Sequence, residues 1–246
     1  MIDSRFPHVR PLIVHSCYHK VGTHWFNNIF NVLASELNVR YQYCAQKDLQ
    51  PDTTLYLDDH SKVDFSGLRP YVASHMIRDP RDVIVSGYFY HLWCTEAWCT
   101  TPKNQYGNKS YQKVLQELSH NDGITFELEH AGATIRSMCS WNYHNTSVLE
   151  IRYEELIANE EVGFAQIFSH YGFTGQDHAI AMATAKRCSF SSVSGRRLGE
   201  EDRGSYMRNG LPGDWRRHFA ADHKKRFKEL FPGVLVKLGY EADEDW

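Results

Sequence analysis

The stretch PLIVHSCYHKVGTHWFNNIFNVLASEL, residues 11–37, contains three successive local patterns. Residues 11–18 form a short apolar run bounded by a proline and a glycine-bearing loop, which predicts a buried strand. From Thr23 onward, apolar residues recur at helical spacing as far as Leu37, which predicts an amphipathic helix. The stretch therefore predicts a strand, a loop and a helix in succession.

The same alternation continues along the chain. Runs rich in β-branched or aromatic residues predict strands, and runs with helical periodicity predict helices. The expected strands cover residues 53–57, 71–77 and 147–153, and the expected helices cover residues 80–93, 110–118, 124–141, 154–171 and 177–186. Strands that alternate with helical crossovers indicate an α/β fold: a single domain, residues 1–246, with a central, mostly parallel β-sheet flanked by helices.

Composition limits the classes of partner. The formal net charge of −3 argues against broad binding to nucleic acid or to an anionic membrane, because both need a basic face. The apolar runs are far shorter than the ~20 residues of a spanning helix, and the N-terminus has no apolar signal region. Six cysteines without a CxxC pair favour reduced thiols and a cytoplasmic location. The fourteen histidines include no HExxH motif, so we expect no metal.

The loop that follows the first predicted strand has features of an anion site. Gly22 permits a tight turn, and a helix that opens at Thr23 directs free N–H groups toward an anion. Lys20 adds a positive charge, Thr23 adds a hydroxyl donor and Trp25 adds an aromatic face. An ordinary strand-to-helix turn with an exposed lysine is the alternative, since the usual two-glycine nucleotide signature is missing.

The second candidate segment is IRDPRDVIVS, residues 77–86. Arg78 ends a predicted strand and can bind phosphate through two N–H groups, while Ser86 lies about two turns into the next helix. We expect Arg81 and Asp82 to form an exposed local ion pair, and Asp79 and Asp82 to cap this helix rather than to hold magnesium.

A third candidate segment, MRNGLPGDWRRHF, covers residues 207–219. It combines Arg208 with two glycines and with Trp215, whose context indicates burial. The segment is suited to close over a phosphate as a lid. A surface loop anchored by its tryptophan is the alternative.

Taken in order, YHKVGTHW, RDPRDVIVS, VLEIRYEEL and RNGLPGDWRRHF resemble the motifs of the soluble, cytosolic-type sulfotransferases. The resemblance covers residues 11–240 and implies their P-loop-NTPase-like fold. It also implies in-line transfer of a sulfuryl group from 3′-phosphoadenosine 5′-phosphosulfate (PAPS) to the hydroxyl of a small alcohol or phenol. The cofactor product would be adenosine 3′,5′-bisphosphate (PAP).

The resemblance also assigns roles to individual residues. Arg78 and Ser86 match the pair that binds the 3′-phosphate, and Tyr153 and Phe190 match residues that contact adenine. Trp25 would stack on the same base. The loop for the 5′-phosphosulfate comprises Lys20, Val21, Gly22, Thr23, His24 and Trp25, and the lid motif comprises Arg208, Asn209 and Gly210.

Several positions depart from the family pattern. Relatives usually have proline at His19, serine at Val21 and threonine at His24, and Asn209 replaces a lysine. The dimerisation motif that follows GDW in animal members is also missing, so the oligomeric state is left open.

The resemblance places the general base between the first helix and the strand that leads to Arg78, just after the strand over residues 53–57. His60 lies there, eighteen residues before Arg78, and would act beside Lys20, which faces the leaving oxygen. His75 is a rival expected in the core, and His91 lies near the end of a helix. A carboxylate, Asp58 or Asp59, is a further alternative, with His60 then a surface residue.

The acceptor and two other classes of function remain open. Residues 91–111 are rich in aromatic side chains and either line an acceptor pocket or form a structural insertion packed on the core. The alternatives to a sulfotransferase are a nucleotide-dependent, kinase-like phosphotransferase that uses ATP and Mg²⁺, and a non-catalytic nucleotide-binding module.

Overall fold

A computed structural model describes residues 11–246. The described chain divides into two compact units. The first contains residues 11–77 and 142–193, and the second contains residues 78–141 and 194–246. Within residues 11–246, no helix has the length and apolar character needed to cross a membrane.

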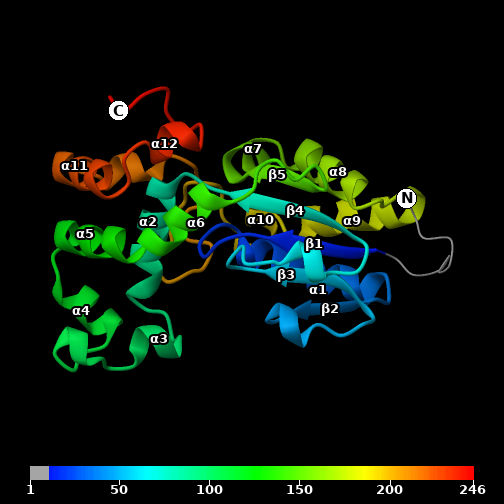
Figure 1. Cartoon of the computed structure of the whole chain (residues 1–246), viewed down its shortest axis with the longest axis horizontal. Helices are drawn as coiled ribbons and strands as arrows, with labels where there is room; N and C mark the ends of the chain where they lie inside the picture. The colour runs from blue at the N-terminus through cyan, green and yellow to red at the C-terminus, as the bar shows by residue number, and fades with distance from the viewer. Residues whose placement is uncertain (1–10) are drawn as a thin grey trace. The chain divides into compact units, whose positions relative to one another are not determined.

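The first unit is built on a five-stranded sheet in the order β2-β3-β1-β4-β5, with every neighbouring pair parallel (Figure 1). This confirms the predicted α/β architecture. Because β1 is central, its side chains are buried on both faces, and all five of its residues are inaccessible to solvent. The strands are β1 Leu12–Ser16, β2 Arg40–Tyr43, β3 Thr53–Asp58, β4 Tyr71–Ile77 and β5 Val148–Arg152.

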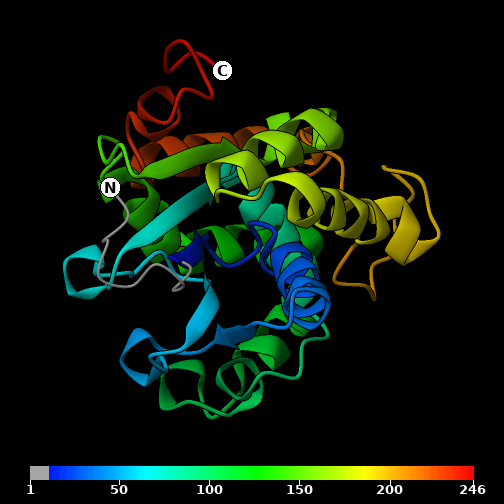
Figure 2. The same cartoon turned by 90° about the vertical axis from the view of Figure 1, so that its right-hand side faces the viewer.

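Helices of the first unit pack on this sheet and on one another. α1 packs against β2, β3 and α9, and α8 packs against α7 and α9 (Figure 2). The helices are α1 Thr23–Glu36, α7 Tyr153–Ala158, α8 Glu160–His170 and α9 Gly175–Arg187, with short 3₁₀ turns η1 Gln46–Asp48 and η2 Phe65–Gly67. α10, Phe190–Ser194, starts at the end of this unit.

A buried histidine joins β1 to α1 and β4. The ring of His15 stacks on Phe26 with centroids 3.4 Å apart, and His15 Nδ1 lies 2.7 Å from Ser74 Oγ. The pKa of His15 is lowered well below its ordinary value, mainly by burial and further by His75. His15 is therefore a neutral core residue, which matches the usual need of a buried polar group for a hydrogen bond.

The second unit is helical, and α2 lies at its centre, packed against α4, α5 and η4. α2 begins as the sequence predicts, with Pro80 at its first turn and the side chain of Asp79 accepting a hydrogen bond from the Arg81 N–H. The helices are α2 Pro80–His91, α3 Ala97–Thr100, α4 Tyr111–Glu117, α5 His120–His130, α6 Gly132–Ser140, α11 Ala221–Leu230 and α12 Val234–Lys237, with 3₁₀ turns η3 Asn104–Tyr106 and η4 Asp214–Arg217.

The structure differs from the predicted elements in several places. The helix expected over 154–171 is two helices, because the Asn159 side chain accepts a hydrogen bond from the Val162 N–H and starts a new one. The helix expected over 124–141 is likewise divided into α5 and α6 at Ala131. The exposed edge strand β2 and the helix α11 were not predicted, because neither shows a long apolar run.

Candidate functional site

Two loops meet at the carboxyl edge of the sheet in the first unit. β1 and β3 pair with Ser16 opposite Asp58, so the loops over residues 17–22 and 58–62 leave the sheet side by side. The Cys17 N–H donates to the Asp58 carbonyl at 2.9 Å, and Ser61 Oγ donates to the Cys17 carbonyl at 2.9 Å. In parallel sheets this edge is where ligands bind, so the contact brings two candidate segments into one place.

The first loop has the backbone conformation of an anion cradle. Lys20 and Gly22 both adopt left-handed conformations, with φ of 65° and 78°, and Gly22 is the N-cap of α1. A Cβ atom on Gly22 would lie 2.5 Å from Met76 Cε, so both conformation and space favour glycine. The first turn of α1, THWF, contains no acidic residue, which leaves the positive end of the helix dipole available to an anion.

The side chains of this loop differ in exposure. Val21 is fully buried and contributes to the core, so its backbone is the part left for a ligand. Thr23 Oγ1 lies 3.4 Å from Cys17 Sγ and from the Tyr18 carbonyl, which orients the hydroxyl toward the loop. His24 is exposed and Lys20 is partly exposed. Of the two residues that depart from the family pattern in this loop, Val21 is buried and His24 is accessible.

The second loop carries His60 in a pair with Asp59. His60 Nδ1 lies 2.6 Å from Asp59 Oδ1, and the Tyr43 hydroxyl donates to the other carboxylate oxygen. The hydrogen bond to Asp59 raises the pKa of His60 above its ordinary value, while burial opposes that rise. The His60 side chain is 57% exposed, so Nε2 belongs to a ring that solvent and ligands can reach. A histidine held by a carboxylate through Nδ1 is the usual arrangement of a general base.

The other candidates for the general base make structural contacts. His75 is buried, with Nδ1 2.6 Å from Glu150 Oε2 and its ring edge on Tyr18, as expected for a core residue. Asp58 accepts hydrogen bonds from Ser16 Oγ at 2.9 Å and from the Lys62 N–H at 3.0 Å, which tie the two loops together. In the second unit, His91 is buried with Nδ1 2.8 Å from Glu127 Oε2.

Two of the predicted adenine-contact residues lie together in the first unit. The rings of Trp25 and Tyr153 meet edge to face with centroids 6.3 Å apart, and Trp25 also meets Phe164 at 5.1 Å. Tyr153 is the first residue of α7 rather than the end of a strand, and Phe190 is the first residue of α10. All three rings are largely buried, so Trp25 also serves the core.

The start of α2 carries the candidates of the second unit. Arg78 is largely buried, and Ser86 is partly exposed on α2. Burial raises the pKa of Asp82, and the positive charge of Arg78 opposes that rise. Asp82 accepts hydrogen bonds from the Gly213 N–H at 2.7 Å and the Trp215 N–H at 2.9 Å, so it anchors the candidate lid to α2.

The expected exposed pair between Arg81 and Asp82 is wrong. Arg81 is 1% exposed and binds Asp79 and Glu241 instead, with Nη2 2.7 Å from Asp79 and Nη1 2.5 Å from Glu241. Its guanidinium also lies 3.8 Å from the centre of the Trp215 ring. Sequence reasoning missed this arrangement because Glu241 is 160 residues away.

The segment around Arg208 is internally bonded. Arg208 Nη1 lies 2.5 Å from Glu201 Oε1, and Nη2 lies 2.5 Å from Asp214 Oδ2. Asn209 is buried, its carbonyl accepts from the Gly199 N–H at 2.9 Å, and Gly210 follows with φ of 70°. The positive residue predicted to meet a phosphate thus has two carboxylate partners that the sequence did not reveal. Trp215 is buried, as predicted.

A five-stranded parallel sheet with a glycine-capped helix after its central strand defines an α/β protein. Residues 75–239 match the sulfotransferase domain family, and the chain belongs to that family.

Curated relatives agree with this assignment. Sulfotransferase 2A1 of Macaca fascicularis is 24% identical over 179 residues, 68% of this chain and 57% of the relative, and human sulfotransferase 2A1 is 24% identical over 176 residues with the same coverage. Mouse sulfotransferase 2A2 is 25% identical over 245 residues, 87% of this chain and 80% of the relative. The chain therefore spans about 57% of the length of the two 2A1 relatives.

Solved structures share the fold. Mouse sulfotransferase SULT7A1 complexed with PAP has a TM-score of 0.61 and 18% identity, covering 94% of this chain and 88% of that one. Retinol dehydratase in complex with androsterone and the inactive cofactor PAP has a TM-score of 0.58 and 14% identity, covering 94% and 82%. These likenesses confirm the predicted sulfotransferase fold.

Proposed function

We propose that this protein is a PAPS-dependent sulfotransferase that acts on the hydroxyl group of a small alcohol or phenol. The observation that carries the proposal is the meeting of two loops at the edge of the sheet. One provides Lys20 and the uncompensated N-terminus of α1, and the other provides His60 bound to Asp59. An anion site beside a carboxylate-held histidine suits transfer of an anionic group to a hydroxyl.

The residues of the first loop fit the 5′-phosphosulfate of the cofactor. A helix N-terminus capped by glycine, with a lysine two residues before the cap and no acidic residue in its first turn, favours a multiply charged group. When bound, PAPS supplies an activated sulfuryl group. The backbone of Val21, Gly22 and His24 would hold the phosphosulfate, together with the Thr23 hydroxyl.

Three side chains would act on the reacting groups. His60 accepts the proton of the acceptor hydroxyl, and Asp59 holds the ring and stabilises the imidazolium that results. Lys20 neutralises charge that develops on the leaving phosphate oxygen. Most of the acceleration would come from such positioning and charge neutralisation.

The remaining candidates would bind the rest of the nucleotide. Arg78 and Ser86 would bind the 3′-phosphate, and Trp25, Tyr153 and Phe190 would contact adenine. Arg208, Asn209 and Gly210 would form the lid. Arg208 must then exchange at least part of its contact with Glu201 or Asp214 for the phosphate. PAP in the two solved structures supports the choice of nucleotide.

The acceptor is proposed to be small and largely apolar. One structural neighbour was crystallised with androsterone and another with retinol, both hydrophobic alcohols. Trp93, from the predicted acceptor segment 91–111, lies in an aromatic cluster just after α2: its ring meets Tyr206 edge to face at 5.0 Å and Tyr90 at 5.2 Å. We assign this aromatic cluster to the acceptor. The proposal treats residues 1–246 as one sulfotransferase domain in the cytoplasm, consistent with six cysteines that form no disulfide among the described residues.

The test compares ligands and then follows transfer. Thermal unfolding is measured with PAP and with ATP–Mg²⁺, because a ligand at 100 times its Kd adds about 2.7 kcal/mol to stability. Labelled sulfate is then followed from PAPS to a panel of alcohols and phenols. Selective stabilisation by PAP together with transfer is expected. Selective stabilisation by ATP–Mg²⁺ would indicate a phosphotransferase, and PAP binding without transfer to any acceptor would indicate a binding module.

Lys20→Ala is the matched variant for this test, and Lys47→Ala, at an exposed lysine of η1, is its control. Loss of the Lys20 charge should lower kcat by about 10²–10³-fold, as loss of one electrostatic donor does. It should also weaken PAP binding. Wild-type kinetics for Lys20→Ala would remove the anion-loop assignment.

A further inference from the structure

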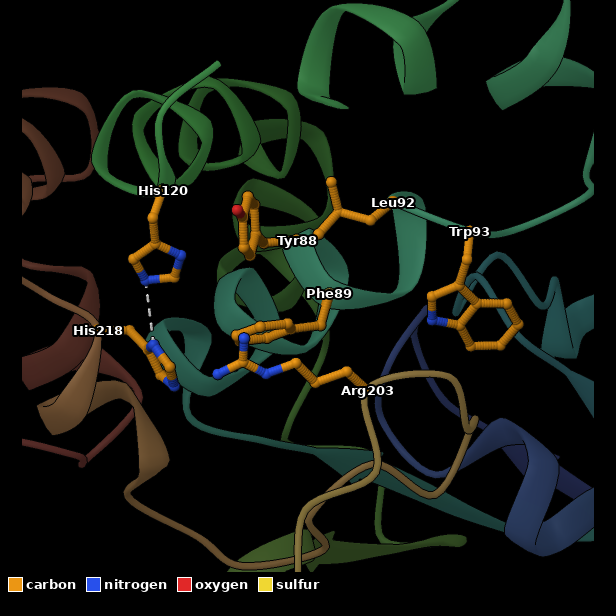
Figure 3. A pocket seen from close by; sticks show the side chains of 7 residues that line it. All are labelled: Tyr88, Phe89, Leu92, Trp93, His120, Arg203 and His218. Atoms are coloured by element: carbon orange, nitrogen blue, oxygen red, sulfur yellow. Dashed lines mark hydrogen bonds between the residues drawn. The ribbon is translucent and has the colours of Figure 1, made fainter. Parts of the chain in front are cut away.

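The second unit contains a cavity of about 480 Å³ that none of the proposed catalytic or nucleotide-binding residues lines (Figure 3). Its apolar walls come from α2 and the residues just after it: Tyr88, Phe89, Leu92 and Trp93. Cavities of this size accept small organic molecules, and flat aromatic walls favour a flat apolar body.

Three nitrogen-bearing side chains line the rest of the cavity. His120 is the first residue of α5, and its Nε2 lies 3.2 Å from Nδ1 of His218, which follows η4 (Figure 3). The guanidinium of Arg203 lies 5.0 Å from the centre of the Phe89 ring and points toward the same side (Figure 3). The basic groups of the lining are therefore two imidazoles and a guanidinium, with the Tyr88 hydroxyl as a further polar group and no carboxylate among the lining residues that the structure describes.

The charges around this polar side are unevenly balanced. His120 faces His218, Arg203 and His223, with Glu201 as the opposing carboxylate. Burial lowers the pKa of His120, and these three neighbours lower it further. His218 Nε2 lies 3.4 Å from Asp214, a carboxylate that Arg208 and Arg217 also approach. A negative group beside His120 and Arg203 would favour the protonated form of this histidine and would be attracted by the guanidinium.

Arg203 is available to such a group. Its contact with Glu201 is a single pair at 3.2 Å, and 68% of its side chain is exposed. Exposed pairs of this kind contribute little to stability, so turning the guanidinium toward a ligand costs little. A guanidinium binds a planar carboxylate through two parallel N–H groups, whereas the ammonium group of a lysine cannot form this bidentate contact.

We propose that this cavity binds an organic carboxylate with a flat apolar body, held by Arg203 and the His120–His218 pair against the α2 aromatic side chains. The single carboxylate matches the single guanidinium of the lining. Apart from Trp93, which also belongs to the aromatic cluster assigned to the acceptor, the inference uses none of the residues assigned to the proposed sulfuryl transfer.

Binding should take up a proton. A carboxylate next to His120 stabilises its protonated form, so the affinity should fall as the pH rises through the range in which the bound histidine loses its proton. Isothermal titration in buffers of different ionisation enthalpy measures this uptake directly.

The experiment uses the full chain with 2-naphthoate and its uncharged analogue 2-naphthamide as probes. We expect saturable binding of 2-naphthoate, with a Kd at least about tenfold lower than that of the amide, as for hydrogen bonds to charged groups. His120→Gln and Arg203→Gln should each weaken 2-naphthoate about tenfold and leave the amide unchanged. Arg226→Gln, a surface arginine paired with Glu129 and Glu229 outside the cavity, is the matched control.

Two measurements separate this inference from the proposed function. PAP should bind His120→Gln and the wild-type chain equally, and saturating PAP should not displace 2-naphthoate. Equal affinity for acid and amide, displacement by PAP, or wild-type binding in both cavity variants would overturn the proposal. Failure of PAP to bind at all would remove the proposed function and leave the carboxylate result to be judged by itself.

Discussion

The loop edge of the first unit and the segment 195–218 of the second unit use their charged residues in opposite ways. At the loop edge, His60 pairs with Asp59 and has a side chain that is 57% exposed, and Lys20 is partly exposed. In the segment, Arg208 is largely buried and both of its terminal nitrogens bind carboxylates. One region presents its groups to solvent, and the other keeps its principal cation engaged within the protein.

The difference shows how each region could select an anion. At the loop edge the proposed anion site is built mainly from the backbone, namely residues with left-handed conformations and a helix N-terminus. These backbone groups need no rearrangement. In the segment, a phosphate bound as proposed would have to compete with Glu201 and Asp214 for Arg208. Substitutions at the loop edge should therefore change rates strongly, whereas those in the segment should change affinity moderately.

The largest effect is expected at His60. His60→Ala removes the proposed base and should lower kcat by about 10²–10⁴-fold, the range found for loss of general-base catalysis. PAP binding should stay close to wild type, because the histidine is assigned to the acceptor hydroxyl and not to the nucleotide. Steady-state kinetics and PAP titration check the two expectations.

His178→Ala is the control for this variant, because His178 lies on α9 away from both loops. If His60→Ala turned over at the wild-type rate, the base would have to be sought elsewhere at the loop edge. If it lost PAP binding, the histidine would belong to the anion site rather than to the acceptor.

Gly22 gives the next largest effect, on the stability of the loop edge. Alanine there should cost about 1–2 kcal/mol for the left-handed backbone, and displacement of Met76 Cε should add to this. Gly172→Ala is a matched control, since Gly172 has a similar φ of 81° and a Cβ there would meet no atom within 4 Å. Urea unfolding of both variants separates the two contributions. Equal losses of stability would show that the close approach of Met76 has no effect.

The strength of local sequence signals explains how much of the fold was predictable. β1 and α1 were predicted because a buried parallel strand reads as a continuous apolar run and an amphipathic helix repeats every 3.6 residues. β2 was missed because an exposed edge strand, RYQY, carries no such run. The divided helix around Asn159 was missed because a capping side chain changes the helix without changing the apolar pattern.

The residues of the candidate site also differ in whether local sequence signals predict them. Lys20, Gly22 and His60 follow predicted strands, and the parallel register that brings Ser16 opposite Asp58 places their loops together. The partners of Arg208 and Arg81 were not predictable, because long-range ion pairs leave no periodic trace in the sequence. His60 and Asp59 are adjacent in sequence, but the sequence DDH does not indicate which of the two aspartates is the hydrogen-bond partner of the imidazole.

A smaller effect is expected for substitutions around Arg208, for which Glu201 and a bound phosphate would compete. Glu201→Gln removes one carboxylate from Arg208 and should tighten PAP binding a few-fold, whereas Arg208→Gln should weaken it about tenfold, as for loss of a charged hydrogen bond. Glu200→Gln is the control, because Glu200 accepts from the Arg197 N–H instead. PAP titrations measure all three. Weaker binding in Glu201→Gln would mean that Glu201 positions Arg208 for the phosphate rather than competing with it.

The smallest effect is expected at Asp59, and it concerns pH. His60 accepts a proton when it is neutral, so kcat should rise with pH and level off above the raised pKa of this histidine. Asp59→Asn removes the carboxylate that favours the imidazolium, so the pKa of His60 should fall and the rising limb should move to lower pH. Asp52→Asn, an exposed aspartate paired with Arg40, should leave the profile unchanged. A rising limb that stays in place in Asp59→Asn would mean that a group other than His60 controls the rate. The assignment of His60 as the base would then be wrong, whereas the proposed anion site at the loop edge would be unaffected.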